Sequence, residues 1–226
     1  MLLHIPQILA REQVSLLRQQ LAQGPWEPDQ LTAGPQASQV KRNLQLPAAC
    51  EASVTLGLAV RQALEAHPLF VSAALPRTFM QPFFNRYEGG GTYGNHVDNA
   101  IRRDPVSGAM LRADVSCTLF LSDPDEYEGG ELVIEDSYGT HEVKLEAGDA
   151  IVYPSTSLHR VEPVTAGCRW ASFMFIQSLV RSDEQRRSLF ELDQSIQALR
   201  AQLGDTPPVV QLTGHYHNLL RQWSEV

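Results

Sequence analysis

The stretch Gly148-Asp149-Ala150-Ile151-Val152-Tyr153-Pro154-Ser155-Thr156-Ser157-Leu158-His159 joins a short run of apolar residues to a turn that ends in a histidine. A run rich in β-branched and aromatic residues, bounded by turn residues, predicts a β-strand. Similar runs recur between Thr78 and Ser178, at Thr78–Tyr87, His96–Asp98, Ala113–Leu121, Glu131–Glu135, His141–Leu145, Ala150–Tyr153, Arg160–Val164 and Arg169–Ile176. Short strands separated by turns indicate a jelly roll or a barrel rather than alternating β-α-β units.

Apolar residues at helical spacing flank this region on both sides. The predicted helices are Ala10–Ala22, Ala49–Ala66, Ser182–Leu203 and His215–Trp223. Pro68 closes the second of them, and Pro207-Pro208 interrupts the C-terminal pattern. The segment Trp26–Leu46 is rich in Gly, Pro, Ser and Gln, which predicts an irregular excursion with a short strand near Val40–Leu46.

These patterns predict an α+β chain in three parts. Residues 1–77 form an N-terminal helical region that packs on the core, residues 78–178 form the core, and residues 179–226 form a C-terminal helical extension. The composition is that of a globular protein, with 43% apolar and 19% charged residues. The 18 basic and 26 acidic side chains give a net charge of −8, which disfavours a phosphate-binding surface. We therefore expect no nucleic-acid partner.

The cysteines indicate a reducing compartment. Cys50, Cys117 and Cys168 stand far apart and show none of the paired spacings of zinc sites or secreted disulfide frameworks. The N-terminal residues carry no recognisable secretion signal, and no run reaches the roughly 18 apolar residues of a membrane-spanning helix. We expect a cytoplasmic protein without a membrane partner, and the sequence leaves its oligomeric state open.

Two potential metal ligands lie one residue apart in Asn95-His96-Val97-Asp98. A strand sends residues i and i+2 to the same face, so one strand can offer an imidazole and a carboxylate together. His159, in the turn after a predicted strand, can provide a third ligand or can merely cap a loop. Two histidines and one carboxylate on a β scaffold form the facial triad of non-haem Fe(II) oxygenases, which leaves adjacent iron positions open.

Arg169 follows His159 within Ala166-Gly167-Cys168-Arg169-Trp170-Ala171-Ser172-Phe173 and has apolar strand neighbours. An arginine in such a strand is costly to bury unless an anion awaits it, and its planar fork suits a carboxylate. The alternatives are an arginine that faces solvent on an edge strand, or one that pairs with an internal Asp or Glu.

Together these motifs resemble the prolyl-hydroxylase branch of the 2-oxoglutarate oxygenases, and more closely the bacterial PKHD-type hydroxylases. The resemblance rests on Tyr87, His96-Val97-Asp98-Asn99, Tyr127-Glu128-Gly129-Gly130-Glu131-Leu132, Gly148-Asp149, His159 and Arg169. It implies a double-stranded β-helix (jelly-roll) core and a dioxygenase that uses Fe(II), 2-oxoglutarate and O2 to hydroxylate a C–H bond, releasing succinate and CO2. It also implies L-ascorbate (vitamin C) as reductant. His96, Asp98 and His159 would bind iron, and Arg169 the distal carboxylate of 2-oxoglutarate.

Two further positions bear on how 2-oxoglutarate would bind. Tyr87 matches an active-site tyrosine of the prolyl hydroxylases, or it is a core aromatic. Some prolyl hydroxylases use a tyrosine to share the distal carboxylate, and Phe120 stands there in this chain, although Phe cannot donate a hydrogen bond. Candidates for that hydroxyl are Ser116, Thr118 and Ser172. The Gly129-Gly130 run is interpreted as a structural turn without a chemical role.

Other functions compete with hydroxylation. Halogenating relatives lack the carboxylate ligand that Asp98 provides, and nucleic-acid demethylating relatives carry a second arginine where this chain has Phe175. A different class is a non-catalytic jelly-roll protein that binds or senses metal, but such a protein has no use for Arg169. The expected substrate is a small molecule or a protein side chain.

The segment Asn99–Arg112 leaves the predicted strand directly after two metal ligands. Pro105 and Gly108 break regular structure there, which predicts a mobile loop beside the iron that selects the primary substrate. Its arginines Arg102, Arg103 and Arg112 form a local positive cluster that can attract an anionic group. The alternative is that they are solvated or pair with Asp104 and Asp114.

Overall fold

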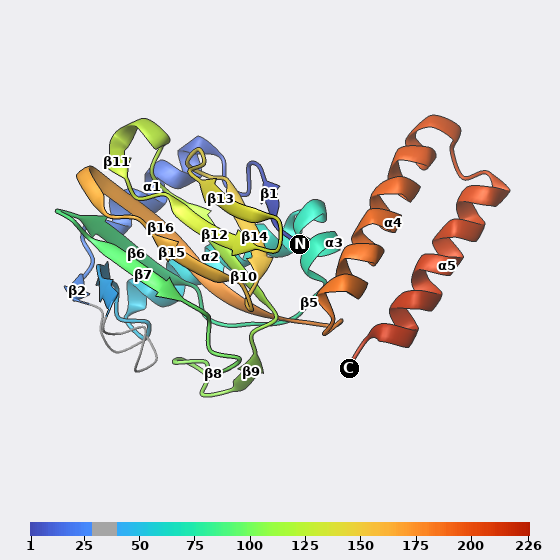
Figure 1. Ribbon diagram of the computed structural model, residues 1–226, viewed down its shortest axis with the longest axis horizontal. Coiled ribbons are helices and arrows are strands. Elements are labelled where there is room, and N and C mark those ends of the chain that lie inside the picture. The colour runs from blue at the N-terminus through green and yellow to red at the C-terminus, as the bar shows by residue number, and fades with distance from the viewer. Residues whose placement is uncertain (29–39) are drawn as a thin grey trace.

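The computed structural model describes residues 1–28 and 40–226 (Figure 1). In this part of the chain the strands form sheets of nine, five and two strands. The larger sheet has the order β1-β14-β10-β16-β6-β4-β2, with β5 and β11 also paired to β16, and the smaller has the order β13-β12-β15-β7-β3. The pairings are antiparallel, as in the predicted jelly-roll core.

The strands of the larger sheet are β1 (Leu3–Ile5), β2 (Glu27–Pro28), β4 (Leu44–Gln45), β5 (Pro76–Phe79), β6 (Phe83–Glu88), β10 (Val115–Phe120), β11 (Tyr127–Gly129), β14 (Ala150–Pro154) and β16 (Val164–Ser178). Those of the smaller sheet are β3 (Lys41–Arg42), β7 (Thr92–His96), β12 (Leu132–Asp136), β13 (Gly139–Val143) and β15 (Leu158–Val161). A short 3-10 helix, η2 (Pro124–Glu126), precedes β11.

The N-terminal helices α1 (Arg11–Leu21), α2 (Glu51–Ala66) and α3 (Pro68–Ala74) pack through apolar side chains on the larger sheet. The prediction that Pro68 ends helical structure was incomplete, because Pro68 is also the first residue of α3, where its missing N–H costs nothing. Residues 1–77 are also not only helical, since they provide β1 to β4. Of the segment Trp26–Leu46, residues 29–39 lie outside the described residues.

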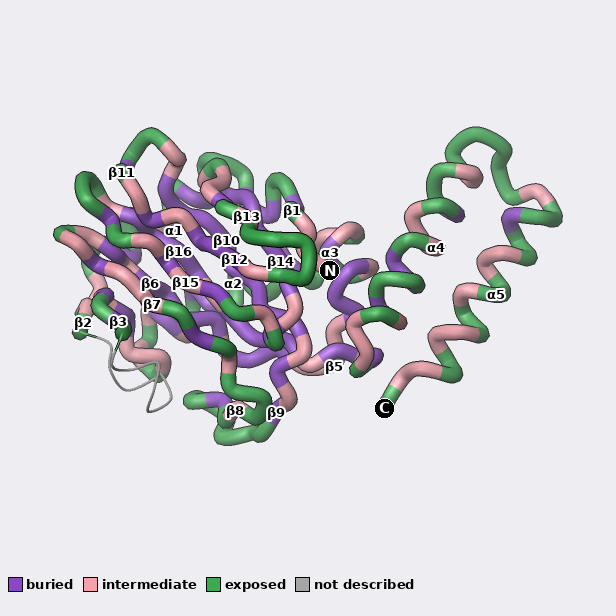
Figure 2. The backbone as a smooth tube through the Cα atoms, in the orientation of Figure 1, coloured by how far each residue is buried: buried purple, intermediate pink, exposed green. Residues whose placement is uncertain are grey.

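The C-terminal helices α4 (Asp183–Leu203) and α5 (Pro207–Trp223) lie side by side and project from the sheets (Figure 1). The helical pattern is interrupted at 204–206, as predicted, and Pro207-Pro208 then begins α5, which is longer than predicted. Buried residues are concentrated in the strands, whereas Val209 is the buried residue of α5 (Figure 2). No helix in the described ranges is both long and apolar enough to span a bilayer.

The predicted loop at Asn99–Arg112 is a β-ribbon instead. β8 (Ile101–Arg103) pairs with β9 (Met110–Arg112). The Asp104 carboxylate closes the turn, because it accepts hydrogen bonds from the backbone N–H groups of Val106 and Ser107 and, from outside the ribbon, of Gln81. The break in regular structure at Pro105 and Gly108 was predicted, but the pairing of the strands on either side of this turn was not.

Candidate active site

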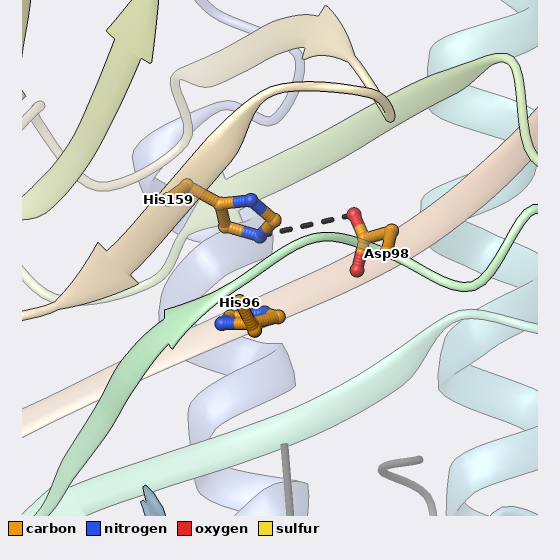
Figure 3. A group of neighbouring side chains, drawn as sticks. All are labelled: His96, Asp98 and His159. Atoms are coloured by element: carbon orange, nitrogen blue, oxygen red, sulfur yellow. Dashed lines mark ion pairs between the residues drawn. The ribbon is translucent and has the colours of Figure 1, made fainter. Parts of the chain in front are cut away.

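The three predicted ligands meet at one point, although not for the reason expected. β7 ends at His96, so Asp98 lies beyond the strand and the alternation rule does not place it. His96 lies opposite His159 in the pairing of β7 with β15. The ligand atoms of His96, Asp98 and His159 lie within 4.8 Å of one another (Figure 3).

Each imidazole is oriented by a backbone carbonyl. His96 Nδ1 lies 2.8 Å from the oxygen of Gly94, and His159 Nδ1 lies 3.0 Å from the oxygen of Ser157. Since a carbonyl only accepts, each Nδ1 must carry the proton, and each Nε2 keeps its lone pair for a metal. Burial lowers the pKa of His96 to about 3, with a further contribution from neighbouring His159, so this imidazole is neutral at physiological pH.

The carboxylate is also held in place. Ser116 Oγ donates to Asp98 Oδ2 at 2.6 Å and lies 2.7 Å from Ser155 Oγ. Because the proton of Ser116 is used on the carboxylate, Ser155 must donate the second bond. His159 Nε2 lies 3.8 Å from Asp98 Oδ2, too far for a hydrogen bond, so the donor set fits a cation between the three side chains.

Removing the Ser116 hydroxyl should weaken metal binding without removing a ligand. We expect Ser116→Ala to lower the affinity for Fe(II) roughly 10–100-fold, as loss of an outer hydrogen-bond partner does in other metal sites. An anaerobic Fe(II) titration against a competing chelator measures this. Ser172→Ala is the matched control, because the Ser172 hydroxyl is buried without a partner. Equal affinities in the two variants would contradict the role of Ser116.

Arg169 is 2% exposed, and its Nε and Nη2 atoms have no hydrogen-bond partner in the structure. Its guanidinium lies 5.3 Å from the ring centre of Tyr87 and 5.2 Å from that of Phe120. The arginine therefore neither faces solvent nor forms an ion pair with an Asp or Glu of the described chain. An unsatisfied buried charge is costly, so this position fits an anion.

One cavity brings the predicted metal ligands and the arginine together. Its lining includes the three predicted ligands together with Arg169 and Tyr87. A metal held by the three ligands can be chelated by the two oxygens of a 2-oxo acid, and Arg169 can bind a carboxylate in the same cavity. 2-Oxoglutarate has both groups, one at each end.

Comparison with known proteins agrees with this geometry. Residues 82–177 match the 2OG-Fe(II) oxygenase superfamily, and residues 183–225 match the PKHD-type hydroxylase C-terminal domain. A PKHD-type hydroxylase of Hyphomonas neptunium is 59% identical over 225 residues, which cover 100% of both chains. The chain belongs to the PKHD-type hydroxylases. Like other members, it is an oxidoreductase that uses Fe(II), 2-oxoglutarate and O2 to hydroxylate a C–H bond.

Solved structures confirm the jelly-roll fold of this family in the chain. A Pseudomonas putida prolyl-4-hydroxylase has a TM-score of 0.54 at 21% identity, covering 78% of this chain and 92% of that one. HygX from Streptomyces hygroscopicus, with nickel and 2-oxoglutarate bound, has a TM-score of 0.52 at 16% identity, covering 79% and 84%. The alternative of a non-catalytic metal-binding protein finds no support in these comparisons.

The predicted hydroxyl candidates near Arg169 differ in position. Ser116 is engaged with Asp98, and Thr118 lines the cavity. Ser172 lies between Ala171 and Phe173, which both line the cavity, so its side chain points to the opposite face of β16. Tyr87 is buried and lines the cavity, and its hydroxyl accepts a hydrogen bond from Asn85 Nδ2 at 3.2 Å.

Sequence reasoning missed Tyr93 and Lys41. The Tyr93 ring stacks on His96 with 3.6 Å between ring centres, and Lys41 Nζ lies 4.9 Å from the Tyr93 ring. Tyr93 and His96 are three residues apart, which places them on opposite faces of a regular strand. A bulge between β7 and β15 inserts one extra residue and brings both to one face. Lys41 lies in the short strand predicted near Val40–Leu46, but nothing in that segment indicated that it lies beside the site.

Proposed function

We propose that His96, Asp98 and His159 hold Fe(II), and that Arg169 binds the distal carboxylate of 2-oxoglutarate in the same cavity. The observation that carries this assignment is the convergence of three ligand atoms beside a buried guanidinium with unsatisfied donors. Two imidazoles and one carboxylate leave adjacent iron positions for a bidentate cosubstrate and O2.

The iron and its cosubstrate would supply the oxidising chemistry, in which 2-oxoglutarate becomes succinate and CO2 while one oxygen atom enters a C–H bond. The protein contributes orientation and charge. The Gly94 and Ser157 carbonyls keep both Nε2 lone pairs directed at the metal, and Ser116 holds the carboxylate. The formal charges of Asp98, Arg169, Fe(II) and 2-oxoglutarate cancel, which lowers the cost of burying these four groups together.

Succinate formation tests this assignment directly. Purified protein should convert 2-oxoglutarate to succinate only when Fe(II) and O2 are supplied, with ascorbate added as the proposed reductant. Asp98→Ala should be inactive, because the carboxylate ligand is lost. Succinate formation by metal-free protein, or by Asp98→Ala at the normal rate, would contradict the proposal.

The primary substrate is proposed to be a small molecule or a single protein side chain that presents a C–H bond to the cavity. A screen of metabolites and peptides for products that gain one oxygen atom, with Asp98→Ala as the blank, would identify it.

The β8–β9 ribbon is proposed to select that substrate through Arg102. Arg102 lines the cavity, and its guanidinium lies 4.0 Å from the Phe175 ring centre. The other arginines of the ribbon are engaged elsewhere: Arg112 pairs with Asp114 and Glu225, and Arg103 donates to the Gly108 carbonyl. The expected positive cluster is thus reduced to one arginine at the cavity.

Replacing Arg102 should separate substrate turnover from cosubstrate turnover. In Arg102→Ala we expect substrate hydroxylation to fall roughly tenfold or more, as for a lost hydrogen bond to a charged group, while uncoupled 2-oxoglutarate decarboxylation continues. Arg103→Ala is the matched control, because its side chain bonds within the ribbon. Hydroxylation and succinate are measured together once the substrate is known. Unchanged coupling in Arg102→Ala would exclude this role.

We propose further that residues 78–178 act as the oxygenase core, with residues 1–77 packed on it and residues 179–226 as an extension. The separate family matches to residues 82–177 and 183–225 support a boundary near residue 180. A cytoplasmic location is proposed as well. It is supported by Cys50, Cys117 and Cys168, which are all free thiols.

A further inference from the structure

A second buried donor without a partner lies beside Arg169. Tyr127 is 4% exposed, and its hydroxyl has no hydrogen-bond partner in the described structure. Buried hydroxyl groups are normally hydrogen-bonded, so an unsatisfied one in a native fold calls for an explanation. The Nε and Nη2 atoms of neighbouring Arg169 are also buried without a hydrogen-bond partner. Donors that lack acceptors are thus found in two neighbouring side chains, of which Arg169 lines the cavity and Tyr127 lies directly behind it.

Strand register places the two side chains on the same face. Tyr127 of β11 lies opposite Gly167 of β16, and Arg169 is two residues further along β16. Residues i and i+2 of a strand point the same way, so Tyr127 and Arg169 are diagonal neighbours within reach of each other's side chains.

Gly130 shows how closely they approach. It has φ +70°, and a Cβ atom added there would lie 3.0 Å from Tyr127 Cε2 and 3.1 Å from Arg169 Cδ. The edge of the phenol ring and the stem of the guanidinium therefore converge on the same glycine. The Gly129-Gly130 run, expected to be only a structural turn, makes room for this approach.

Tyr127 is held in position and stays protonated. Lys144 Nζ donates to the Tyr127 backbone carbonyl at 2.8 Å and lies 4.1 Å from the ring centre. Burial raises the pKa of Tyr127, and the positive charge of Arg169 together with a polar contact from its side chain offsets this only in part. The phenol is therefore a hydrogen-bond donor at neutral pH. A protonated hydroxyl next to a guanidinium, with both lacking acceptors, matches the two oxygens of a carboxylate.

We propose that Tyr127 donates a hydrogen bond to the distal carboxylate of 2-oxoglutarate and is the second anchor beside Arg169. It supplies the hydroxyl that Phe120 lacks, from β11 rather than from β10. Of the candidates expected from sequence, Ser116 serves Asp98 and Ser172 points away from the cavity. Thr118 lines the cavity, but its hydroxyl interacts with the Tyr153 side chain. The inference rests on the proposed function, because it takes Arg169 as the first anchor.

Direct binding measurements test it without turnover. Calorimetry on Fe(II)-loaded protein without O2 gives the Kd of 2-oxoglutarate and of 2-oxopentanoate, which has a methyl group in place of the distal carboxylate. Tyr127→Phe should raise the Kd of 2-oxoglutarate roughly tenfold or more, since the lost bond is to a charged group. The Kd of 2-oxopentanoate should stay the same. Tyr138→Phe, at a position 89% exposed, is the matched control.

The comparison of variants separates this inference from the proposed function. If Arg169→Ala weakens 2-oxoglutarate binding but Tyr127→Phe does not, Tyr127 is not an anchor and the proposed function stands. If neither variant changes the Kd, the carboxylate lies elsewhere and both are wrong. Equal weakening of both ligands by Tyr127→Phe, or a loss specific to 2-oxoglutarate in Tyr87→Phe alone, would also overturn the inference.

Discussion

Replacing His159 by alanine is expected to abolish iron binding and turnover together. The remaining His96 and Asp98 are a two-ligand site, and no other His, Cys, Asp or Glu of the described residues completes a cluster with them. Mutation of a group that hydrogen-bonds to a metal ligand typically lowers metal affinity roughly 10–100-fold, and we expect the loss of a ligand itself to lower the Fe(II) affinity by more. The iron content after desalting and the rate of succinate formation should decrease in parallel.

A matched histidine variant shows whether the loss is specific. His141→Ala removes a partly exposed imidazole of β13, which pairs with Asp136 on the protein surface. It should keep one iron per chain and normal turnover. If His159→Ala retained stoichiometric iron and near-normal 2-oxoglutarate consumption, the ligand assignment would be wrong.

Local chemistry made much of the fold predictable. Most strand runs of the core and the long helices at both ends overlap the observed elements, because residue type and helical spacing report directly which face is buried. The run His96–Asp98 is the exception, since β7 ends at His96. The apolar neighbours of Arg169 likewise indicated burial, and the structure places this residue in the cavity wall. The jelly-roll assignment followed from the same strand pattern and is confirmed.

The features that were missed depend on contacts distant in sequence. Asp98 approaches His159 after its strand has ended, and the bulge that brings Tyr93 beside His96 exists only in the pairing with β15. The closeness of Tyr127 to Arg169 depends on the register of β11 against β16. The spacing of apolar residues and the secondary-structure propensity each describe one segment at a time. They therefore do not predict the register between two strands or a bulge in their pairing.

Arg169→Ala is expected to raise the KM for 2-oxoglutarate much more than it weakens iron binding. A bidentate contact between a guanidinium and a carboxylate contributes about 1.5–3 kcal/mol, which corresponds to roughly a tenfold to over a hundredfold change in affinity. Arg169→Lys should recover part of this, since the charge remains but the planar fork is lost. Steady-state succinate formation at varied 2-oxoglutarate, together with an Fe(II) titration, measures both quantities.

A second buried arginine distinguishes a cosubstrate anchor from a structural residue. Arg186 is 3% exposed, and it donates hydrogen bonds to the Val180 and Arg181 carbonyls and to Asp183. Arg186→Ala breaks these internal bonds and should lower the melting temperature of the cosubstrate-free protein while the KM stays constant. Arg169 has unsatisfied donors in the cosubstrate-free protein, so Arg169→Ala should destabilise it less. If Arg169→Ala instead lowered the melting temperature as Arg186→Ala does and left the KM unchanged, Arg169 would be structural and the carboxylate would bind elsewhere.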